Sequence, residues 1–119
     1  MNSILVADDE PNARLLVKRV LEKKFKVIEA EDGDEAVKLT HKMKPDLVLL
    51  DIMMPKVDGF EACYQIKQNK ETAGTPVIML TAVDYELNRK LGERVGADSY
   101  ITKPINPQQL MDKINELLK

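Results

Sequence analysis

The stretch Leu47-Val48-Leu49-Leu50-Asp51-Ile52-Met53-Met54-Pro55-Lys56-Val57-Asp58-Gly59 decides how the rest of the chain is interpreted. Its apolar run has the length of a strand and ends on the carboxylate of Asp51, after which Pro55 and Asp58-Gly59 turn the chain. A continuous apolar run is typical of a strand buried on both faces of a parallel sheet. Ligands of open α/β sheets bind at the carboxyl ends of the strands. Asp51 is therefore a candidate site residue, and a turn or helix-cap residue is the alternative.

Composition limits the class of protein. The chain has 119 residues, of which 44% are hydrophobic and 32% charged, as is typical of one folded domain. Its net charge of −2 would not concentrate nucleic acid, so we expect no direct nucleic-acid binding. The single Cys63 excludes an internal disulfide, and we expect a packed helical thiol. No apolar stretch approaches the roughly 20 residues that span a bilayer, and no signal peptide is recognisable, so we expect a cytoplasmic protein without membrane insertion.

Four more strands are predicted, over residues 3–7, 26–30, 76–80 and 99–102, and helical patterns alternate with the strands. In the first helix, which Pro11 begins, the apolar residues at helical spacing are Ala13, Leu16, Val17, Val20 and Leu21, and we expect them to form its buried face. In the last helix, Leu110, Ile114 and Leu117 form the equivalent stripe.

Local signals mark several helix ends. Asp58 with Glu61, and Asn106 with Gln109, match the N-cap and N3 positions of capping boxes. The fourth helix, over about residues 84–95, contains Gly92, which costs about 1 kcal/mol relative to alanine. We therefore expect this helix to be the least stable one. Gly96 is expected to end it in a left-handed conformation.

Five alternating strands and helices predict an α/β fold. The common arrangement for five such units is the flavodoxin-like (βα)5 three-layer sandwich, with a parallel five-stranded sheet of order 2-1-3-4-5. In that order the ends of the first and third strands lie side by side. One edge of the sheet would then collect polar residues from four strand ends: Asp8, Asp9, Asp51, Thr81 and Lys103.

The chemistry of this set favours phosphoryl transfer. Crowded carboxylates repel one another unless a cation neutralises them, and hard oxygen ligands suit Mg²⁺. A carboxylate can attack phosphorus and form an aspartyl phosphate, with a divalent ion and a lysine neutralising charge. The Thr81 hydroxyl offers a bond to a phosphoryl oxygen. Each residue also has an ordinary alternative, because Asp9 and Thr81 could cap helices and Lys103 could be a solvated surface lysine. Their joint occurrence at strand ends favours the site.

From end to end, residues 1–119, the chain resembles the receiver domain of two-component response regulators. The matching motifs are Asp8-Asp9, Asp51-Ile52-Met53-Met54-Pro55 with Asp58-Gly59, Leu80-Thr81-Ala82, and Gly96-Ala97-Asp98 through Tyr100 to Lys103-Pro104. Two positions depart from the family pattern: Ile105 stands where an aromatic residue is frequent, and Ser99 where an acidic residue is common.

The resemblance implies that Asp51 accepts a phosphoryl group from a phosphohistidine on a histidine kinase or histidine phosphotransfer protein. It implies that Asp9, Asp51 and the main-chain carbonyl of Met53 bind Mg²⁺ (or Mn²⁺) directly, while Asp8 acts largely through water. Lys103 would pair with the phosphoryl oxygens, and its peptide bond to Pro104 is typically cis in this family.

The resemblance also implies a conformational switch. Thr81 would move to bond the phosphate, and Tyr100 would turn inward behind it. The face made by the fourth helix, the last strand and the last helix would change and so control a downstream protein. For Tyr100 the alternative is an ordinary half-buried tyrosine with its hydroxyl in water. Because neither Met53 nor Val83 offers an acid or amide to orient water, we hypothesise slow self-dephosphorylation.

The expected function is a stand-alone phosphoacceptor switch without a separate turnover substrate. One alternative is the N-terminal receiver fragment of a larger transcriptional regulator. A second is a Mg²⁺-dependent phosphohydrolase with an aspartyl intermediate, whose Asp-x-Asp motif would fall at Asp8-Asp9-Glu10, although no cap domain is present. A third is a flavodoxin-like FMN carrier, which requires a Ser/Thr-rich phosphate loop and aromatic residues. Here the aromatic content is only 4%.

Overall fold

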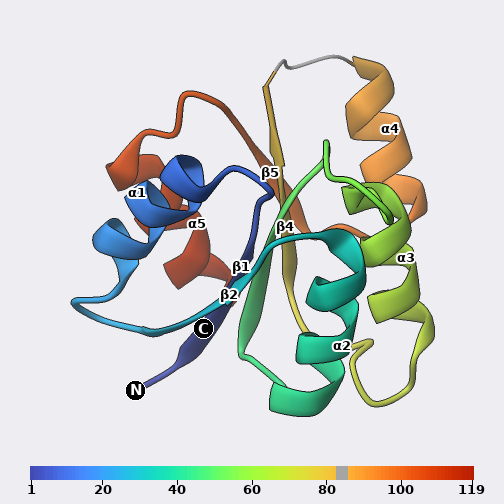
Figure 1. The fold of residues 1–119 in the computed structure, drawn as a ribbon, viewed down its shortest axis with the longest axis horizontal. Coiled ribbons are helices and arrows are strands. Elements are labelled where there is room, and N and C mark those ends of the chain that lie inside the picture. The colour runs from blue at the N-terminus through green and yellow to red at the C-terminus, as the bar shows by residue number, and fades with distance from the viewer. Residues whose placement is uncertain (83–85) are drawn as a thin grey trace.

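One parallel sheet in the order β2-β1-β3-β4-β5 forms the centre of the molecule in the computed structural model (Figure 1). The structure describes residues 1–82 and 86–119, without the side chains of residues 86 and 87. The strands are β1 (Ser3–Ala7), β2 (Lys26–Ala30), β3 (Leu47–Asp51), β4 (Val77–Thr81) and β5 (Ser99–Thr102). The predicted flavodoxin-like sheet order is confirmed.

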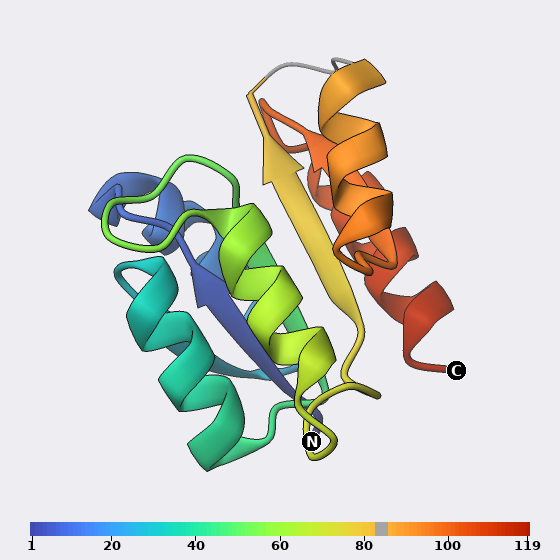
Figure 2. The same ribbon diagram turned by 90° about the vertical axis from the view of Figure 1, so that its right-hand side faces the viewer.

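Helices cover both faces of this sheet. They are α1 (Pro11–Leu21), α2 (Gly33–Met43), α3 (Gly59–Gln68), α4 (Glu86–Arg94) and α5 (Pro107–Leu117). Helices α1 and α5 lie on one face, and α2, α3 and α4 lie on the other (Figures 1 and 2). Within the described residues, none of these helices combines the length and apolar character that crossing a membrane requires.

Strand β3 supplies apolar side chains to the core on both faces, as its unbroken run predicts. Leu47 and Leu49 pack with residues of α1 and α5, whereas Val48 and Leu50 pack with residues of α2 and α3. All five residues of β3 are buried. The strand's last residue, Asp51, is therefore carried on a backbone with little freedom to shift, at the edge where the sheet ends.

The helix ends follow the sequence signals. Asp58 accepts a hydrogen bond from the backbone N–H of Glu61, and Asn106 accepts one from that of Gln109, so both predicted N-caps are confirmed. Gly96, which follows α4, has a φ of +92°. Its predicted left-handed conformation is therefore confirmed. The predicted start of the fourth helix, Asp84, lies outside the described residues.

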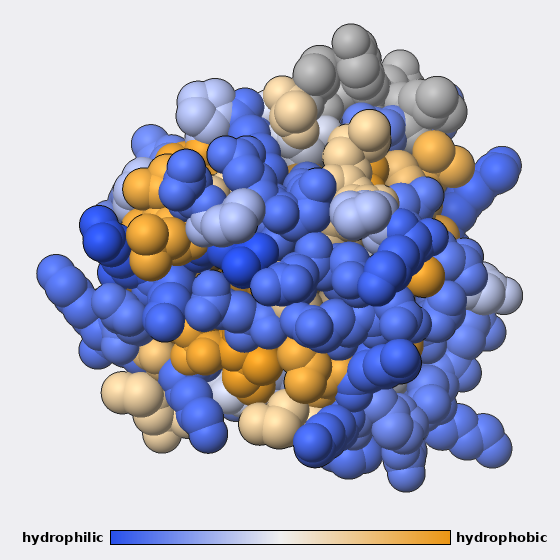
Figure 3. All heavy atoms as spheres, in the orientation of Figure 1, coloured by the Kyte–Doolittle hydropathy of each residue, from blue (hydrophilic) through white to orange (hydrophobic). Residues whose placement is uncertain are grey.

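Helix α1 departs from its predicted buried face. Val17 and Leu21 are buried, but the Leu16 side chain is 67% exposed, so its placement in the apolar core was wrong. Neighbouring residues of a helix differ by about 100° in direction, and Val17 and Leu21 already fill the line that faces the sheet. The surface view shows hydrophobic atoms gathered over α1, in the upper left (Figure 3).

Lys67 fastens α3 to the segment before β5. Its ammonium donates hydrogen bonds to the Thr75 carbonyl (2.7 Å) and to Asp98 Oδ2 (2.8 Å). The same Asp98 oxygen accepts the backbone N–H of Val77 at the start of β4 (2.8 Å). Because the Lys67 side chain is only 14% exposed, this ion pair is better shielded from water than an ordinary surface pair.

Gly59 begins α3 in direct contact with the end of β3. A Cβ atom there would collide with the main-chain carbonyl of Asp51 and the Cα of Ile52. The Gly59 N–H also donates to the Ile52 carbonyl (2.9 Å). Only glycine therefore permits this close approach of the two backbones. Elsewhere in α3 the Cys63 thiol is buried, as predicted, and burial raises its pKa to about 11.

Candidate functional site

The candidate residues lie at the carboxyl ends of four strands. Asp8 directly follows β1, Asp51 and Thr81 are the last residues of β3 and β4, and Lys103 directly follows β5. The strands are paired so that Asp51 is opposite Leu80, and Thr81 opposite Thr102. These ends therefore reach the same edge of the sheet, at its top in Figure 1.

Three carboxylates meet at this edge. Asp8, Asp9 and Asp51 each offer an oxygen, and these oxygens all lie within 4.8 Å of one another. Asp8 and Asp51 are buried, whereas Asp9 is exposed. The alternative that Asp9 caps α1 is not what the structure has, because the N-cap position is Glu10, without a side-chain cap hydrogen bond. Asp9 is thus available to the carboxylate cluster.

The ammonium of Lys103 faces this cluster. Its Nζ lies 3.1 Å from Asp8 Oδ2 and 3.5 Å from Asp51 Oδ1. The Lys103 backbone N–H donates to the Thr81 carbonyl (2.6 Å), which joins the end of β4 to the loop after β5. The Lys103–Pro104 peptide is cis, as expected. Lys103 is thus not a solvated surface lysine, because it pairs with two carboxylates from different strands.

Burial and charge shift the titration of this cluster. Burial raises the pKa of Asp51 from the ordinary 3.8 to about 6, the Lys103 charge lowers it in part, and the Asp8 charge adds to the increase. A backbone hydrogen bond from Met53 also lowers the Asp51 pKa. Burial lowers the pKa of Lys103, but its hydrogen bond to Asp8 and the two carboxylate charges outweigh that effect and raise it. One ammonium therefore compensates the buried negative charge incompletely.

This donor set fits a small divalent cation. Its members are carboxylates, which are hard oxygen ligands, and they converge from two adjacent strands into one partly buried cluster. Burial is the main effect that disfavours ionised Asp51, and such a cation would offset it by neutralising the carboxylate charge. The Met53 backbone is beside Asp51, but its predicted role as a carbonyl ligand stays a prediction.

Sequence reasoning did not identify Arg14 as a residue of the site. The Arg14 side chain is only 12% exposed. Its guanidinium donates to the Asp8 carbonyl (2.8 Å) and to Glu29 Oε1 (3.4 Å). Arg14 thus helps to hold the main chain of Asp8 in place. The signal that could have found it is its position in the first turn of the helix that follows Asp8-Asp9, where a long side chain reaches back toward the strand end.

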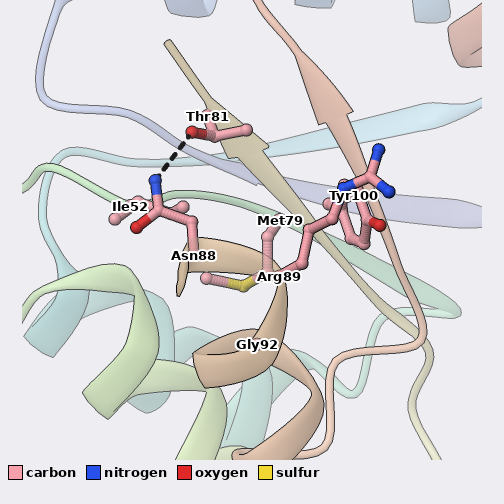
Figure 4. A pocket seen from close by; sticks show the side chains of 7 residues that line it. All are labelled: Ile52, Met79, Thr81, Asn88, Arg89, Gly92 and Tyr100. Carbon is pink, nitrogen blue, oxygen red and sulfur yellow. Dashed lines mark hydrogen bonds between the residues drawn. The ribbon is translucent and has the colours of Figure 1, made fainter. Parts of the chain in front are cut away.

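The two predicted switch residues contact α4 (Figure 4). Thr81 is buried, and its Oγ1 accepts a hydrogen bond from Asn88 Nδ2 (3.4 Å). Tyr100 is half-buried in β5, and the Arg89 guanidinium lies 4.6 Å from the centre of its ring. Sequence reasoning missed both α4 residues. The alternative that Thr81 caps the fourth helix depends on residues 83–85, which lie outside the described residues. Val83, on which the dephosphorylation hypothesis partly depends, is one of them.

Comparison with known proteins identifies relatives over nearly the whole chain. The family model "Response regulator receiver domain" matches residues 4–115. The alkaline phosphatase synthesis transcriptional regulatory protein PhoP of Bacillus subtilis is 44% identical over 98% of this chain, which spans about half the length of PhoP (48%). Protein PilH of Pseudomonas aeruginosa is 40% identical over 99% of this chain and 98% of its own length.

Solved structures agree with the fold. The chemotaxis protein CheY4 of Vibrio cholerae superimposes with a TM-score of 0.94 at 30% identity, covering 99% of each chain. The receiver domain of the sensor histidine kinase PA1611 from Pseudomonas aeruginosa superimposes with a TM-score of 0.92 at 24% identity, covering 98% of this chain and 97% of that one. The PA1611 domain is described with a magnesium ion coordinated in its active-site cleft.

Proposed function

The chain belongs to the response regulator receiver family, and from that premise we propose that it is a switch activated by phosphorylation of Asp51. The phosphoryl group would come from a phosphohistidine on a histidine kinase or a histidine phosphotransfer protein. One observation carries the proposal: the Lys103 ammonium pairs with both Asp8 and Asp51, which belong to a group of three carboxylates from the ends of β1 and β3.

In the proposed reaction a carboxylate oxygen of Asp51 attacks phosphorus, the bond from phosphorus to the donor imidazole breaks, and the imidazole keeps the electron pair. The ammonium of Lys103 would pair with the phosphoryl oxygens and offset their charge. Mg²⁺ (or Mn²⁺), when bound, neutralises negative charge on the carboxylates and the phosphoryl group. Asp9, Asp51 and the Met53 carbonyl would hold it directly and Asp8 through water. The short Asp8–Lys103 distance supports a role for Asp8 in orienting the lysine.

An apolar groove beside the site supports docking of a protein donor. Lys103 is part of its wall, and so is the exposed Leu16 of α1. The remaining wall is formed by Ala13, Val17, Val20, Pro104, Ile105 and Pro107, and the groove encloses about 290 Å³. A groove lined by exposed apolar side chains offers a surface on which another protein can bind. A donor docked here would approach Asp51 from the side of Lys103.

The output of the switch is proposed to be the face of α4, β5 and α5, which would bind a downstream protein. Thr81 would bond the phosphoryl group and Tyr100 would turn inward, so that phosphorylation changes this face. The chain matches 98% of the length of PilH and 48% of the length of PhoP, a transcriptional regulatory protein, so a stand-alone switch and a receiver portion within a larger transcriptional regulator both stay candidates. In either case the chain would assist its own phosphorylation and dephosphorylation without a separate turnover substrate.

The test is labelling of the purified chain with acetyl phosphate, or with a phosphohistidine donor, in the presence of Mg²⁺. Asp51→Ala should eliminate labelling. The matched control is Asp112→Ala, which removes an exposed carboxylate of α5 outside the cluster and should leave labelling unchanged. Full labelling of Asp51→Ala at another single residue would refute the assignment. Turnover of phosphomonoesters beyond one phosphate per protein would favour the phosphohydrolase.

A further inference from the structure

A small cavity separates the two proposed switch residues (Figure 4). Its wall is formed by Ile52 after β3, Met79 and Thr81 of β4, Tyr100 of β5, and Asn88, Arg89 and Gly92 of α4. It encloses about 10 Å³, which is the space of at most one water molecule. The Tyr100 ring is far larger than a water molecule. Inward rotation of Tyr100 therefore requires that residues of the α4 wall move.

Asn88 holds Thr81 on the side of α4. Its Nδ2 donates to Thr81 Oγ1 over 3.4 Å, a distance near the upper limit for a hydrogen bond. Because the contact is already near that limit, a movement of the Thr81 hydroxyl toward a phosphoryl group on Asp51 would break it. The hydrogen bond therefore favours the arrangement in which Thr81 has not moved.

Arg89, the next residue of α4, holds Tyr100. Its guanidinium carbon lies 4.6 Å from the ring centre, which is the geometry of a cation–π contact. Figure 4 shows the Arg89 side chain extending along the ring of Tyr100. Rotation of the ring away from its present position would disrupt this contact. Two consecutive residues of one helix thus oppose the two movements that the proposed switch requires.

Gly92 supplies space at the wall of the same cavity. A Cβ atom at this position would lie 3.8 Å from Ala97 Cβ and 4.0 Å from Met79 Cγ, which are ordinary contact distances. Packing in the present arrangement therefore does not require glycine here. Its missing side chain does leave room on the wall that faces the cavity, where a turned tyrosine ring would need it.

We infer that Asn88 and Arg89 act as a latch of positioning residues, which holds Thr81 and Tyr100 in the unphosphorylated arrangement, and that Gly92 leaves part of the space that the Tyr100 ring takes up once the α4 wall has moved. This inference rests on the proposed function and adds the means by which α4 sets the threshold of the switch. A phosphoryl mimic binds better to the arrangement in which Thr81 and Tyr100 have moved. Loss of a latch contact raises the fraction of protein in that arrangement, and the apparent affinity for the mimic rises with it.

The test measures binding of beryllofluoride to the full chain in the presence of Mg²⁺, by calorimetry, for Asn88→Ala and Arg89→Ala. Each variant should bind about two- to fivefold more tightly than the unaltered chain, the effect of losing one weak contact. The control Arg94→Ala removes a cation from the same helix, away from the cavity, and should bind as the unaltered chain does. Unchanged or weaker binding of Asn88→Ala and Arg89→Ala overturns the latch.

A double-mutant cycle separates the contact from a general effect on α4. If Arg89 acts through the ring, Arg89→Ala should no longer raise the affinity in a Tyr100→Leu chain. An equal gain in both backgrounds contradicts the latch. If the unaltered chain neither binds beryllofluoride nor becomes labelled on Asp51, the proposed function itself fails. Normal binding and labelling with no effect of the α4 variants refutes the latch alone.

The Gly92 part has its own variant, Gly92→Ala. It should raise the melting temperature, because alanine favours the helix, and yet weaken beryllofluoride binding by about threefold or more, because a methyl group takes up space meant for the ring. The control Gly74→Ala, at a position with no atoms within 4 Å of an added Cβ, should leave the binding unchanged. Unchanged binding of Gly92→Ala contradicts this part of the inference.

Discussion

Replacement of Asp51 by asparagine should stabilise the metal-free protein while abolishing its phosphorylation. Burial raises the pKa of Asp51 from 3.8 to about 6, so the folded chain holds the ionised carboxylate at a cost of roughly 3 kcal/mol near neutral pH. Asparagine has nearly the same shape and carries no charge. It also loses the ion pair with Lys103, whose effect is already contained in the net shift. We expect an increase of about 1–3 kcal/mol in the free energy of unfolding.

The sign of the pH dependence follows from the same shift. Because the folded pKa of Asp51 lies above the unfolded one, the folded state binds more protons between pH 3.8 and about 6. The penalty from Asp51 is fully present above that range and disappears below it. The stability difference between Asp51→Asn and the unaltered chain should therefore be largest at about pH 7.5 and should shrink steadily toward about pH 4.

The assay is urea denaturation with EDTA and then with Mg²⁺, at several pH values. Mg²⁺ should stabilise the unaltered chain, because it binds the folded state, and should stabilise Asp51→Asn much less. The control Asp112→Asn changes an exposed carboxylate and should alter stability by no more than about 0.5 kcal/mol. The reasoning is refuted if Asp51→Asn is less stable than the unaltered chain in EDTA at about pH 7.5, or if the difference grows as the pH falls.

Three other changes test separate parts of the molecule. Leu16→Glu should lower phosphotransfer from a protein donor by about tenfold or more, because that donor must dock on the apolar groove. Labelling by acetyl phosphate, which needs no docking, should stay unchanged. An equal loss with both donors contradicts this prediction. Met53→Asn should hasten decay of radiolabelled phosphoprotein several-fold, since an amide can orient water where the exposed methionine cannot; slower decay would count against our hypothesis. Lys67→Met should cost about 1–2 kcal/mol in urea denaturation, because Asp98 loses its ammonium partner; an unchanged midpoint would exclude that role.

The strand ends were predicted well from the sequence, because two independent signals indicate each of them. An apolar run stops, and a polar residue follows or ends it, as at Asp51, Thr81 and Lys103. Parallel pairing then brings all these ends to one edge without any further information. The closeness of Lys103 to Asp8 and Asp51 is therefore a property of the topology, which short-range patterns already determine.

Side-chain contacts that depend on how a helix is rotated against the sheet were not predicted from the sequence. The apolar spacing in α1 allowed Leu16 or Val17 to face the core, and only packing against the sheet decides that Val17 does so. The same limit applies to Asn88 and Arg89, which are ordinary polar residues of α4 until the helix is placed over Thr81 and Tyr100. Arg14 was missed because its charge suggested solvent.

Because of the close approach at Gly59, the backbone at the start of α3 is in direct contact with the backbone of Asp51. The two backbones touch with no side chain between them, so neither can be displaced without the other following. Strain that arises at the acceptor would be passed straight to the first turn of α3, which lies on the same face of the sheet as α4. A single methyl group added at position 59 would accordingly be expected to misalign the acceptor, although position 59 is not one of the three residues of the carboxylate cluster.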